Sequence, residues 1–273
     1  MYYEQLTIFS DAIEHDIGYA GKYGAKGEKR APKQKPTPEQ IEKQNQKNRE
    51  TRLKRLIHHN FTPEDLWVTL KYPKGTRKSV KELKKDFTGF IRRISYQYKK
   101  RGVPLKWVAR KEIGARGGLH VHILVNRIPK EDTDLIIRKA WGNPIWHTTL
   151  FSQGGYEALA EYITKKPSGQ VKGQLSLFPE DEQDELISYS RSRNLEEPKT
   201  ERKEYSRRTV KKIIEALQSG DYMACATKGH YIDKDSIRIG VNPFTGLSYI
   251  HYAEYRLDMP PEYWGGPLPW EET

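Results

Sequence analysis

The sequence predicts an α+β fold, a central antiparallel sheet with flanking helices, to which a basic N-terminal arm and a C-terminal extension are added. Three observations support this prediction. From Leu66 onward, strand-like and helix-like patterns follow one another in the order β-α-β-β-α-β-α. The strand-like runs alternate and are rich in β-favouring residues, and glycines join the middle two. This order suits an antiparallel sheet with helices packed on one face.

The first strand is expected in DLWVTLKYP, where apolar and polar residues alternate until Pro73 ends the strand. Ser79 then precedes apolar residues at helical spacing, which indicates a capped helix. The strands LKWVARKE and LHVHILVN follow, joined by a turn that contains Gly114, Gly117 and Gly118.

After this hairpin we expect a helix over 130–140, a strand over 145–150 and a helix over 155–166. Beyond Pro167 the chain turns polar and acidic (FPEDEQDE), which is typical of a linker. A last helix over 209–218 and strand-like runs over 237–241 and 249–255 complete the chain.

Composition and charge give a division into an arm (1–52), a domain (53–198) and an extension (199–273). Residues 20–52 are rich in lysine and almost free of large aliphatic side chains, so they cannot bury enough apolar area to fold alone. We interpret them as a flexible basic arm that leads into a helix.

The formal net charge of +12 favours a polyanion as the partner, because Lys and Arg that neutralise phosphates release condensed counterions. Solubility alone is the other explanation. The single cysteine, Cys225, excludes an intramolecular disulfide framework and a cysteine-rich zinc site. With no secretory signal pattern and no apolar run of about 20 residues, we expect a cytoplasmic protein without membrane contact.

Two histidines give the sharpest chemical signal. His120 and His122 alternate with apolar residues in a strand, so both imidazoles lie on one sheet face while the apolar side chains face the helices. Hairpin pairing brings Glu112 near them. Two imidazoles and one carboxylate can hold a divalent metal with positions left open. Polar residues on a solvated face are the bland alternative.

The helix GGYEALAEYITKK carries a second signal. Tyr156, Leu159, Ala160 and Ile163 form its apolar stripe, Tyr162 falls beside that stripe, and Lys165 lies three residues beyond Tyr162 on the same side. A neighbouring ammonium and a metal-bound phosphate both favour attack by a phenol. A tyrosine at the rim of the core is the alternative.

In this order, Glu112, His120-Val121-His122 and Tyr162-Ile163-Thr164-Lys165 resemble the HUH endonuclease superfamily, in the arrangement of phage and plasmid rolling-circle replication initiators. The resemblance covers about residues 53–198. It extends to three further segments, which are Asn60-Phe61 before DLWVTLKY, Trp141-Gly142, and Ser190-Arg191-Ser192-Arg193-Asn194-Leu195. Lys71 departs from the usual first motif, where threonine is more common.

The resemblance implies an RRM-like sheet and a site-specific nickase and ligase of single-stranded DNA. In this role Tyr162 is the nucleophile that forms a 5′-phosphotyrosine link, Lys165 assists it, and Glu112, His120 and His122 hold Mn²⁺ or Mg²⁺. Nearby basic residues are expected to contact DNA: Arg110, Lys111, Arg116 and Lys166.

The partners implied are an origin, which can include a hairpin, and a host polymerase. A host helicase is also expected, because no phosphate-binding G-x-x-x-x-G-K-[ST] motif occurs in the sequence. A relaxase or single-tyrosine transposase of the same superfamily is the first alternative, although relaxases usually place the tyrosine before the histidines. A non-catalytic nucleic-acid binding module, with Trp67 and Tyr72 stacking on bases, is the second.

Overall fold

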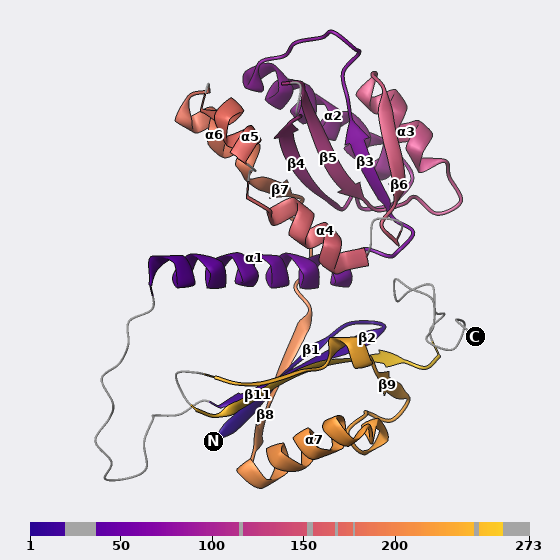
Figure 1. The fold of residues 1–273 in the computed structure, drawn as a ribbon. Helices are drawn as coiled ribbons and strands as arrows, with labels where there is room; N and C mark the ends of the chain where they lie inside the picture. The colour runs from indigo at the N-terminus through magenta and orange to yellow at the C-terminus, as the bar shows by residue number, and fades with distance from the viewer. Residues whose placement is uncertain are drawn as a thin grey trace, which may run out of the picture. The chain divides into compact units, whose positions relative to one another are not determined.

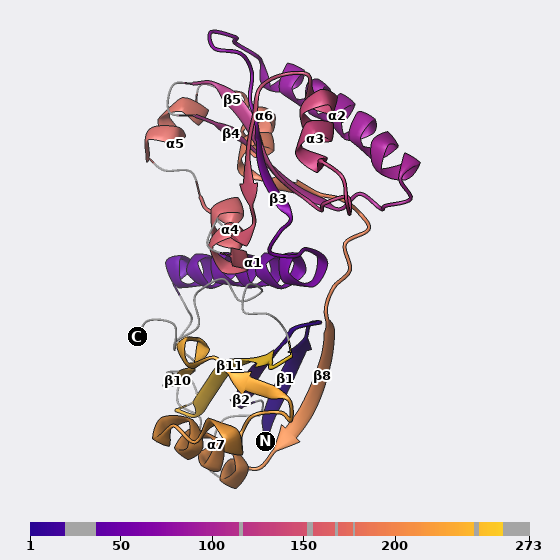
Figure 2. The same ribbon diagram turned by 90° about the vertical axis from the view of Figure 1, so that its right-hand side faces the viewer.

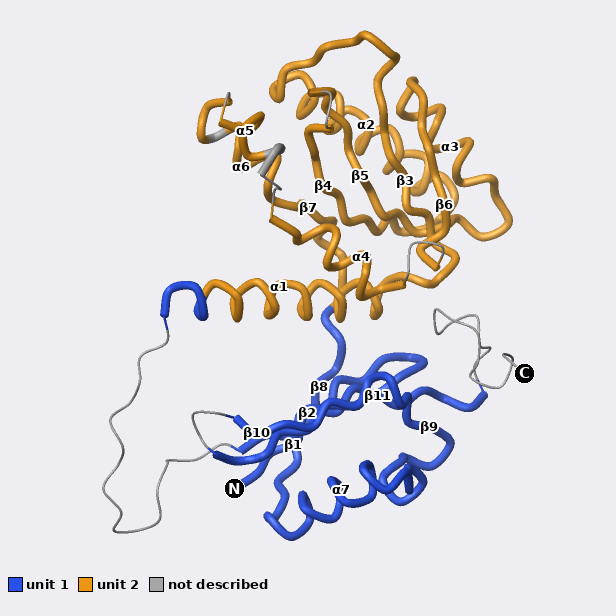
Figure 3. Tube along the Cα trace, viewed as in Figure 1, with its two compact units in different colours: residues 1–41, 197–263 blue, residues 42–196, 264–273 orange. Residues whose placement is uncertain are grey.

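The computed structural model describes residues 1–19, 37–114, 117–151, 155–166, 169–176, 178–242 and 246–258. The chain divides into two units, shown in two colours in Figure 3. Unit 1 comprises residues 1–41 and 197–263, and unit 2 comprises residues 42–196 and 264–273. Each unit is built on an antiparallel sheet with helices, so the predicted α+β class is confirmed.

Unit 2 is built on a five-stranded sheet of order β6-β3-β5-β4-β7, in which all neighbours are antiparallel (Figure 1). The strands are β3 (Leu66–Leu70), β4 (Trp107–Ile113), β5 (Leu119–Val125), β6 (Ile145–Thr149) and β7 (Tyr189–Arg191). The helices are α1 (Pro38–Asn60), α2 (Val80–Lys100), α3 (Thr133–Trp141), α4 (Gly155–Thr164), α5 (Gly169–Leu175) and α6 (Glu180–Ile187).

One face of this sheet packs on α2 and α3, which lie side by side in Figure 2. The alternation in β5 places Val121 and Ile123 on this face, where they meet Phe90 and Ile94 of α2, and all four are fully buried. Helix α2 begins at the predicted cap, because Ser79 accepts from the Glu82 backbone and Glu82 returns a bond to Ser79.

The opposite face of the same sheet packs on α1 and α4. Its core contains Leu53 and Ile57 of α1, Leu159 and Ile163 of α4, and Trp67 of β3. Helices therefore cover both faces of the sheet, whereas the sequence pattern suggested only one. The apolar stripe predicted for α4 is confirmed, since Leu159, Ala160 and Ile163 are buried.

Unit 1 contains a second antiparallel sheet of order β10-β11-β2-β1-β8, with β9 also paired to β11. Its strands are β1 (Tyr2–Ile8), β2 (Ala12–Tyr19), β8 (Lys199–Tyr205), β9 (His230–Ile232), β10 (Arg238–Val241) and β11 (Ser248–Arg256). Helix α7 (Arg207–Ser219) packs Val210 and Leu217 against it.

Residues 2–19, which we expected within the basic arm, form β1 and β2 instead. Both runs alternate, and their apolar side chains Tyr2, Leu6 and Ile17 are buried, so charge in the following lysine-rich segment masked a strand signal. Residues 37–52 of the arm lie at the start of α1 or just before it, and residues 20–36 lie outside the described residues.

Two further expectations were wrong. The acidic segment after Pro167 is not a linker, because residues 180–187 form α6 and bury Leu186 against the core of unit 2. Helix α3 begins at Thr133 rather than near 130, because Lys130 has φ of 61°, which a right-handed helix does not allow. Among the described residues, no helix has the length and apolar character needed to span a bilayer.

Candidate active site

The β4–β5 hairpin places three side chains of the predicted metal site on the same sheet face. In its register Glu112 is opposite His120 and Arg110 is opposite His122. The hairpin closes through a hydrogen bond from the Gly114 nitrogen to the Gly118 oxygen of 2.9 Å, and Gly117 has φ of 73°, a conformation that favours glycine. The sequence therefore predicted both the hairpin and the approach of Glu112 to the histidines correctly.

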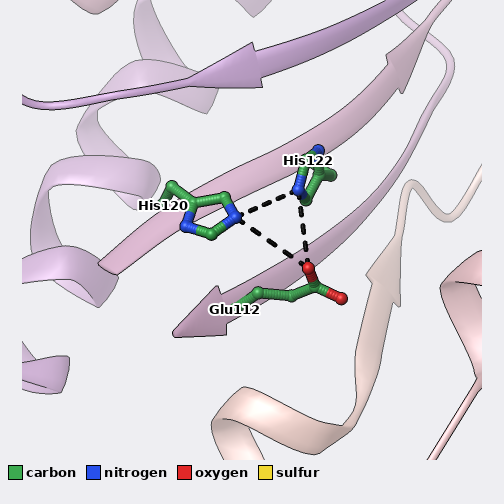
Figure 4. Close-up of side chains that lie close together, drawn as sticks. All are labelled: Glu112, His120 and His122. Atoms are coloured by element: carbon green, nitrogen blue, oxygen red, sulfur yellow. Dashed lines mark hydrogen bonds and ion pairs between the residues drawn. The ribbon is translucent and has the colours of Figure 1, made fainter. Parts of the chain in front are cut away.

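We call Glu112, His120 and His122 the Glu/His cluster (Figure 4). The two Nε2 atoms are 3.1 Å apart, and Glu112 Oε2 lies 3.5 Å from His122 Nε2 and 3.9 Å from His120 Nε2. All three side chains are about half-buried, and one ligand atom from each lies within 4.8 Å of the others. Three acceptor atoms therefore converge on one small volume.

The chemistry of these donors fits a divalent cation. His120 Nδ1 faces the Gly118 carbonyl oxygen at 3.4 Å, and a carbonyl only accepts, so Nδ1 carries the proton and Nε2 keeps its lone pair. Burial, together with the positive charges of His120 and Lys165, lowers the pKa of His122 to about 3, and burial also lowers the pKa of His120. Both imidazoles are neutral at neutral pH, the form that binds metals.

Tyr162 reaches the cluster from α4. Its hydroxyl donates to Glu112 Oε2 at 2.8 Å and lies 3.0 Å from His122 Nε2. Its ring meets Trp67 edge to face, and Trp67 stacks in parallel on His122 with centroids 5.4 Å apart. Burial raises the pKa of Tyr162, as do the charge of Glu112 and its hydrogen bond, so the phenol is protonated in the metal-free site.

Two lysines bring positive charge to this site. Lys165 Nζ lies 3.6 Å from the centroid of the Tyr162 ring and 4.0 Å from Glu112 Oε1. Lys71 follows β3 on the face of the cluster and is exposed. After burial, the charges of both lysines are among the causes that lower the pKa of each histidine, so both ammonium groups act on the cluster.

Arg110 holds the end of α4 in place. Its NH1 donates to the carbonyl oxygens of Tyr162, Ile163 and Lys165 at 3.2, 2.7 and 2.8 Å, and its Nε lies 3.0 Å from Glu112 Oε1. The last carbonyls of a helix lack partners within the helix, and a cation there is favourable. We expected Arg110 to contact DNA, but its side chain is 3% exposed and is occupied by these contacts, so we assign it a positioning role.

The other expected DNA contacts lie elsewhere. Lys111 points to the opposite sheet face, where it is buried and pairs with Glu185 of α6. Lys166 is exposed at the end of α4 and pairs with Glu42 of α1. Arg116 lies outside the described residues.

Sequence reasoning missed Thr69 and the exposed ring of this face. Thr69 Oγ1 lies 3.1 Å from His122 Nδ1 and helps to fix that imidazole. Trp146 pairs in register with Thr69 and is 49% exposed, whereas Trp67, which we expected to be exposed, is only 3% exposed. The period of two in β3 and β6 places Trp67, Thr69 and Trp146 on the cluster face and was the available signal.

Comparison with known proteins gives one match. Residues 65–168 match a family model of replication-associated proteins, the ORF2 group. Glu112, His120, His122, Tyr162 and Lys165 all lie within this range. No curated protein and no solved structure matches the chain. The match indicates a replication-associated protein, with DNA as its partner.

Proposed function

We propose that this protein is an HUH-type endonuclease and strand transferase that nicks single-stranded DNA at an origin and so initiates rolling-circle replication. The observation that carries the proposal is the position of the Tyr162 hydroxyl, 2.8 Å from Glu112 Oε2 and 3.0 Å from His122 Nε2. A nucleophile that touches two ligand atoms of a metal site is placed to attack a phosphate bound there. The match to a replication-associated family supports the same role.

The reaction exchanges one phosphoester for another. A bond forms between Tyr162 Oη and the scissile phosphorus while the bond from phosphorus to the 3′ oxygen breaks, and the phenol proton is transferred, directly or through solvent, to that oxygen. The products are a 5′-phosphotyrosine on the protein and a free 3′-hydroxyl for a host polymerase. Because the bond types are conserved, the same site can reseal the strand.

The residues divide the work between charge and position. A divalent cation held by Glu112, His120 and His122, Mn²⁺ or Mg²⁺, would offset the Glu112 charge and act as a Lewis acid on the phosphate. Lys165 and Lys71 supply fixed positive charge where negative charge develops. Arg110 keeps Tyr162 and Lys165 in register with Glu112.

A single tyrosine carries the reaction in this proposal. Tyr156, on the same helix, donates its hydroxyl to the Phe61 carbonyl oxygen at 3.3 Å and stacks on His58, so it is held in the α1–α4 packing. A host helicase would then separate the strands at the origin, in the cytoplasm where the replicon resides.

The test compares Tyr162→Phe with Tyr156→Phe, each of which removes one phenolic oxygen from α4. Tyr162→Phe should lose both nicking and the denaturant-resistant protein–DNA adduct while it still binds the oligonucleotide. Tyr156→Phe should keep both activities. An adduct that persists in Tyr162→Phe would place the nucleophile elsewhere and refute the proposal.

A further inference from the structure

A basic groove lies between α2 and α3, on the sheet face opposite the Glu/His cluster (Figure 2). Its volume is about 910 Å³, and its lining includes Arg92, Arg93, Arg101 and Lys139 but no acidic residue among those described. We call it the α2–α3 groove. Two large side chains on its wall are exposed to solvent, Tyr96 by 65% and Leu135 by 55%.

The cations of this groove are only partly neutralised. Arg101 Nε lies 3.0 Å from Glu131 Oε1, and Arg93 Nε donates to the Ala140 carbonyl oxygen at 2.7 Å, a contact that fixes its charge without cancelling it. Arg92 and Lys139 are exposed and make no ion pair with any described residue. The groove therefore presents a net positive charge with defined positions.

A second hollow continues the groove around α3. It has a volume of about 690 Å³, shares Leu135 and Lys139 with the α2–α3 groove, and adds Arg138. Asp134 is its acidic member, and it lies 3.9 Å from His147 on the same wall. The positive surface thus runs from α2 across α3 towards β6, the strand at the edge of the sheet.

We propose that the α2–α3 groove binds the sugar-phosphate backbone of duplex DNA beside the single strand that is cut. This inference rests on the proposed function, because it concerns the substrate of the same protein. The groove and Tyr162 lie on opposite faces of one sheet, so they contact different segments of the DNA.

Geometry favours a duplex over a second single strand. Proteins that bind single strands stack successive bases on several rings, whereas Tyr96 is the one aromatic side chain in the described lining of this groove. From Arg92 to Arg101, α2 rises about 14 Å at 1.5 Å per residue, which matches about four base pairs of duplex at 3.4 Å each. A rigid row of cations of this length fits a regular phosphate backbone.

The test uses the double variant Arg92→Gln/Lys139→Gln and the control Lys81→Gln/Lys85→Gln. The control removes the same charge from exposed positions of α2 that do not line the groove. Binding is measured for a single-stranded oligonucleotide and for the same strand extended by a hairpin duplex, each against salt concentration. Nicking of the bare single strand is measured in parallel.

Because the double variant neutralises two fewer phosphates, the slope of log affinity against log salt should fall by about 1.8 for the duplex-bearing substrate. That change corresponds to about 30-fold weaker binding at 0.15 M salt relative to 1 M salt, where counterion release contributes little. Affinity for the bare strand and its nicking should stay unchanged, and the control should retain both affinities.

Equal decreases for both substrates would mean that the groove binds single strands, and the duplex proposal would be wrong. Unchanged affinity for both would also overturn it and would make an acidic protein surface the better occupant. Failure of the wild-type protein to nick would refute the proposed function, but it would leave the binding comparison intact.

Discussion

Each unit of this protein places histidine beside glutamate, and the two sites differ in almost every other respect. In unit 2 the Glu/His cluster has two imidazoles, one carboxylate and nearby lysines. In unit 1, His15 lies between two carboxylates, with Nδ1 2.8 Å from Glu4 Oε1 and Nε2 3.4 Å from Glu254 Oε1. We call Glu4, His15 and Glu254 the His15 cluster.

The His15 cluster is closed to further ligands. All three side chains are buried, and His15 stacks on Tyr252 with centroids 4.3 Å apart. The Tyr205 hydroxyl donates to Glu4 Oε2 at 2.8 Å, and the Thr227 nitrogen donates to both Glu254 oxygens. Its carboxylates already have donors, so the cluster serves to join strands.

The charge of the histidine follows from its neighbours. Burial disfavours the charged form of His15, but the hydrogen bonds and charges of Glu254 and Glu4 outweigh burial and raise the pKa of His15. At His122 burial and neighbouring cations act in the same direction, and the pKa falls to about 3. The comparison teaches that burial alone does not decide the role of a histidine, because the sign of the surrounding charge does.

The largest effect that tests this contrast is removal of the metal site. His122→Ala should lower nicking by about 10³-fold or more, because the phosphate is no longer stabilised electrostatically. A chelator should give the same decrease in the wild-type protein and Mn²⁺ should reverse it, while oligonucleotide binding persists. Full nicking in excess chelator would refute a catalytic metal.

The counterpart in unit 1 is a stability effect. His15→Ala leaves two buried carboxylates without their cation, and we expect unfolding of unit 1 to become easier by about 3 kcal/mol, the cost of breaking a buried ion pair. Denaturant unfolding measures this change. Nicking by the folded variant should match the wild-type protein, and a decrease of nicking in folded His15→Ala would mean that the two clusters are not functionally separate.

A smaller effect concerns the lysine over the tyrosine ring. Lys165→Ala should slow nicking by about 10²-fold, as expected for one charge-stabilising contact. Lys165→Arg should recover part of the rate, since it restores the charge. Single-turnover kinetics at saturating DNA separates this effect from binding. Lys166→Ala, which removes the neighbouring exposed cation, is the control and should change the rate little.

The smallest effect is the pH dependence of the His15 cluster. The folded pKa of His15 is raised, so its stabilisation is complete below 6.5 and is lost as pH rises through the folded pKa. The pKa of Glu254 is lowered despite burial, chiefly by its hydrogen bond to His15, so its contribution is complete above 4.5 and is lost at lower pH. The difference in urea midpoint between wild type and His15→Ala should therefore shrink from about pH 5.5 to about pH 8.5. A constant difference would contradict a charged His15.

The parts of the site that follow local patterns were predicted from the sequence. Alternation in β5 and the glycine turn fixed the register that brings Glu112 to His120, and the apolar stripe of α4 left Tyr162 beside the core. The role of Arg110 could not be predicted, because it depends on where the last turn of α4 packs, 52 to 55 residues away along the chain.

Unit 1 escaped prediction for a related reason. The pairing of Leu6 with Glu201 and of His15 with Tyr252 joins residues about 200 positions apart, and no local period reports such a partner. The burial of Glu4 and Glu254 is understood only once β1, β2 and β11 are neighbours.

The sheet of unit 1 draws its strands from both ends of the chain, and this has a consequence for biosynthesis. At about 5–20 residues per second, a ribosome needs about 10–50 s after β2 to complete β11. During that interval the β1–β2 hairpin has no permanent neighbours, and an isolated hairpin is marginally stable at best. The nascent protein can therefore complete the nuclease fold while its first 19 residues still await their partners.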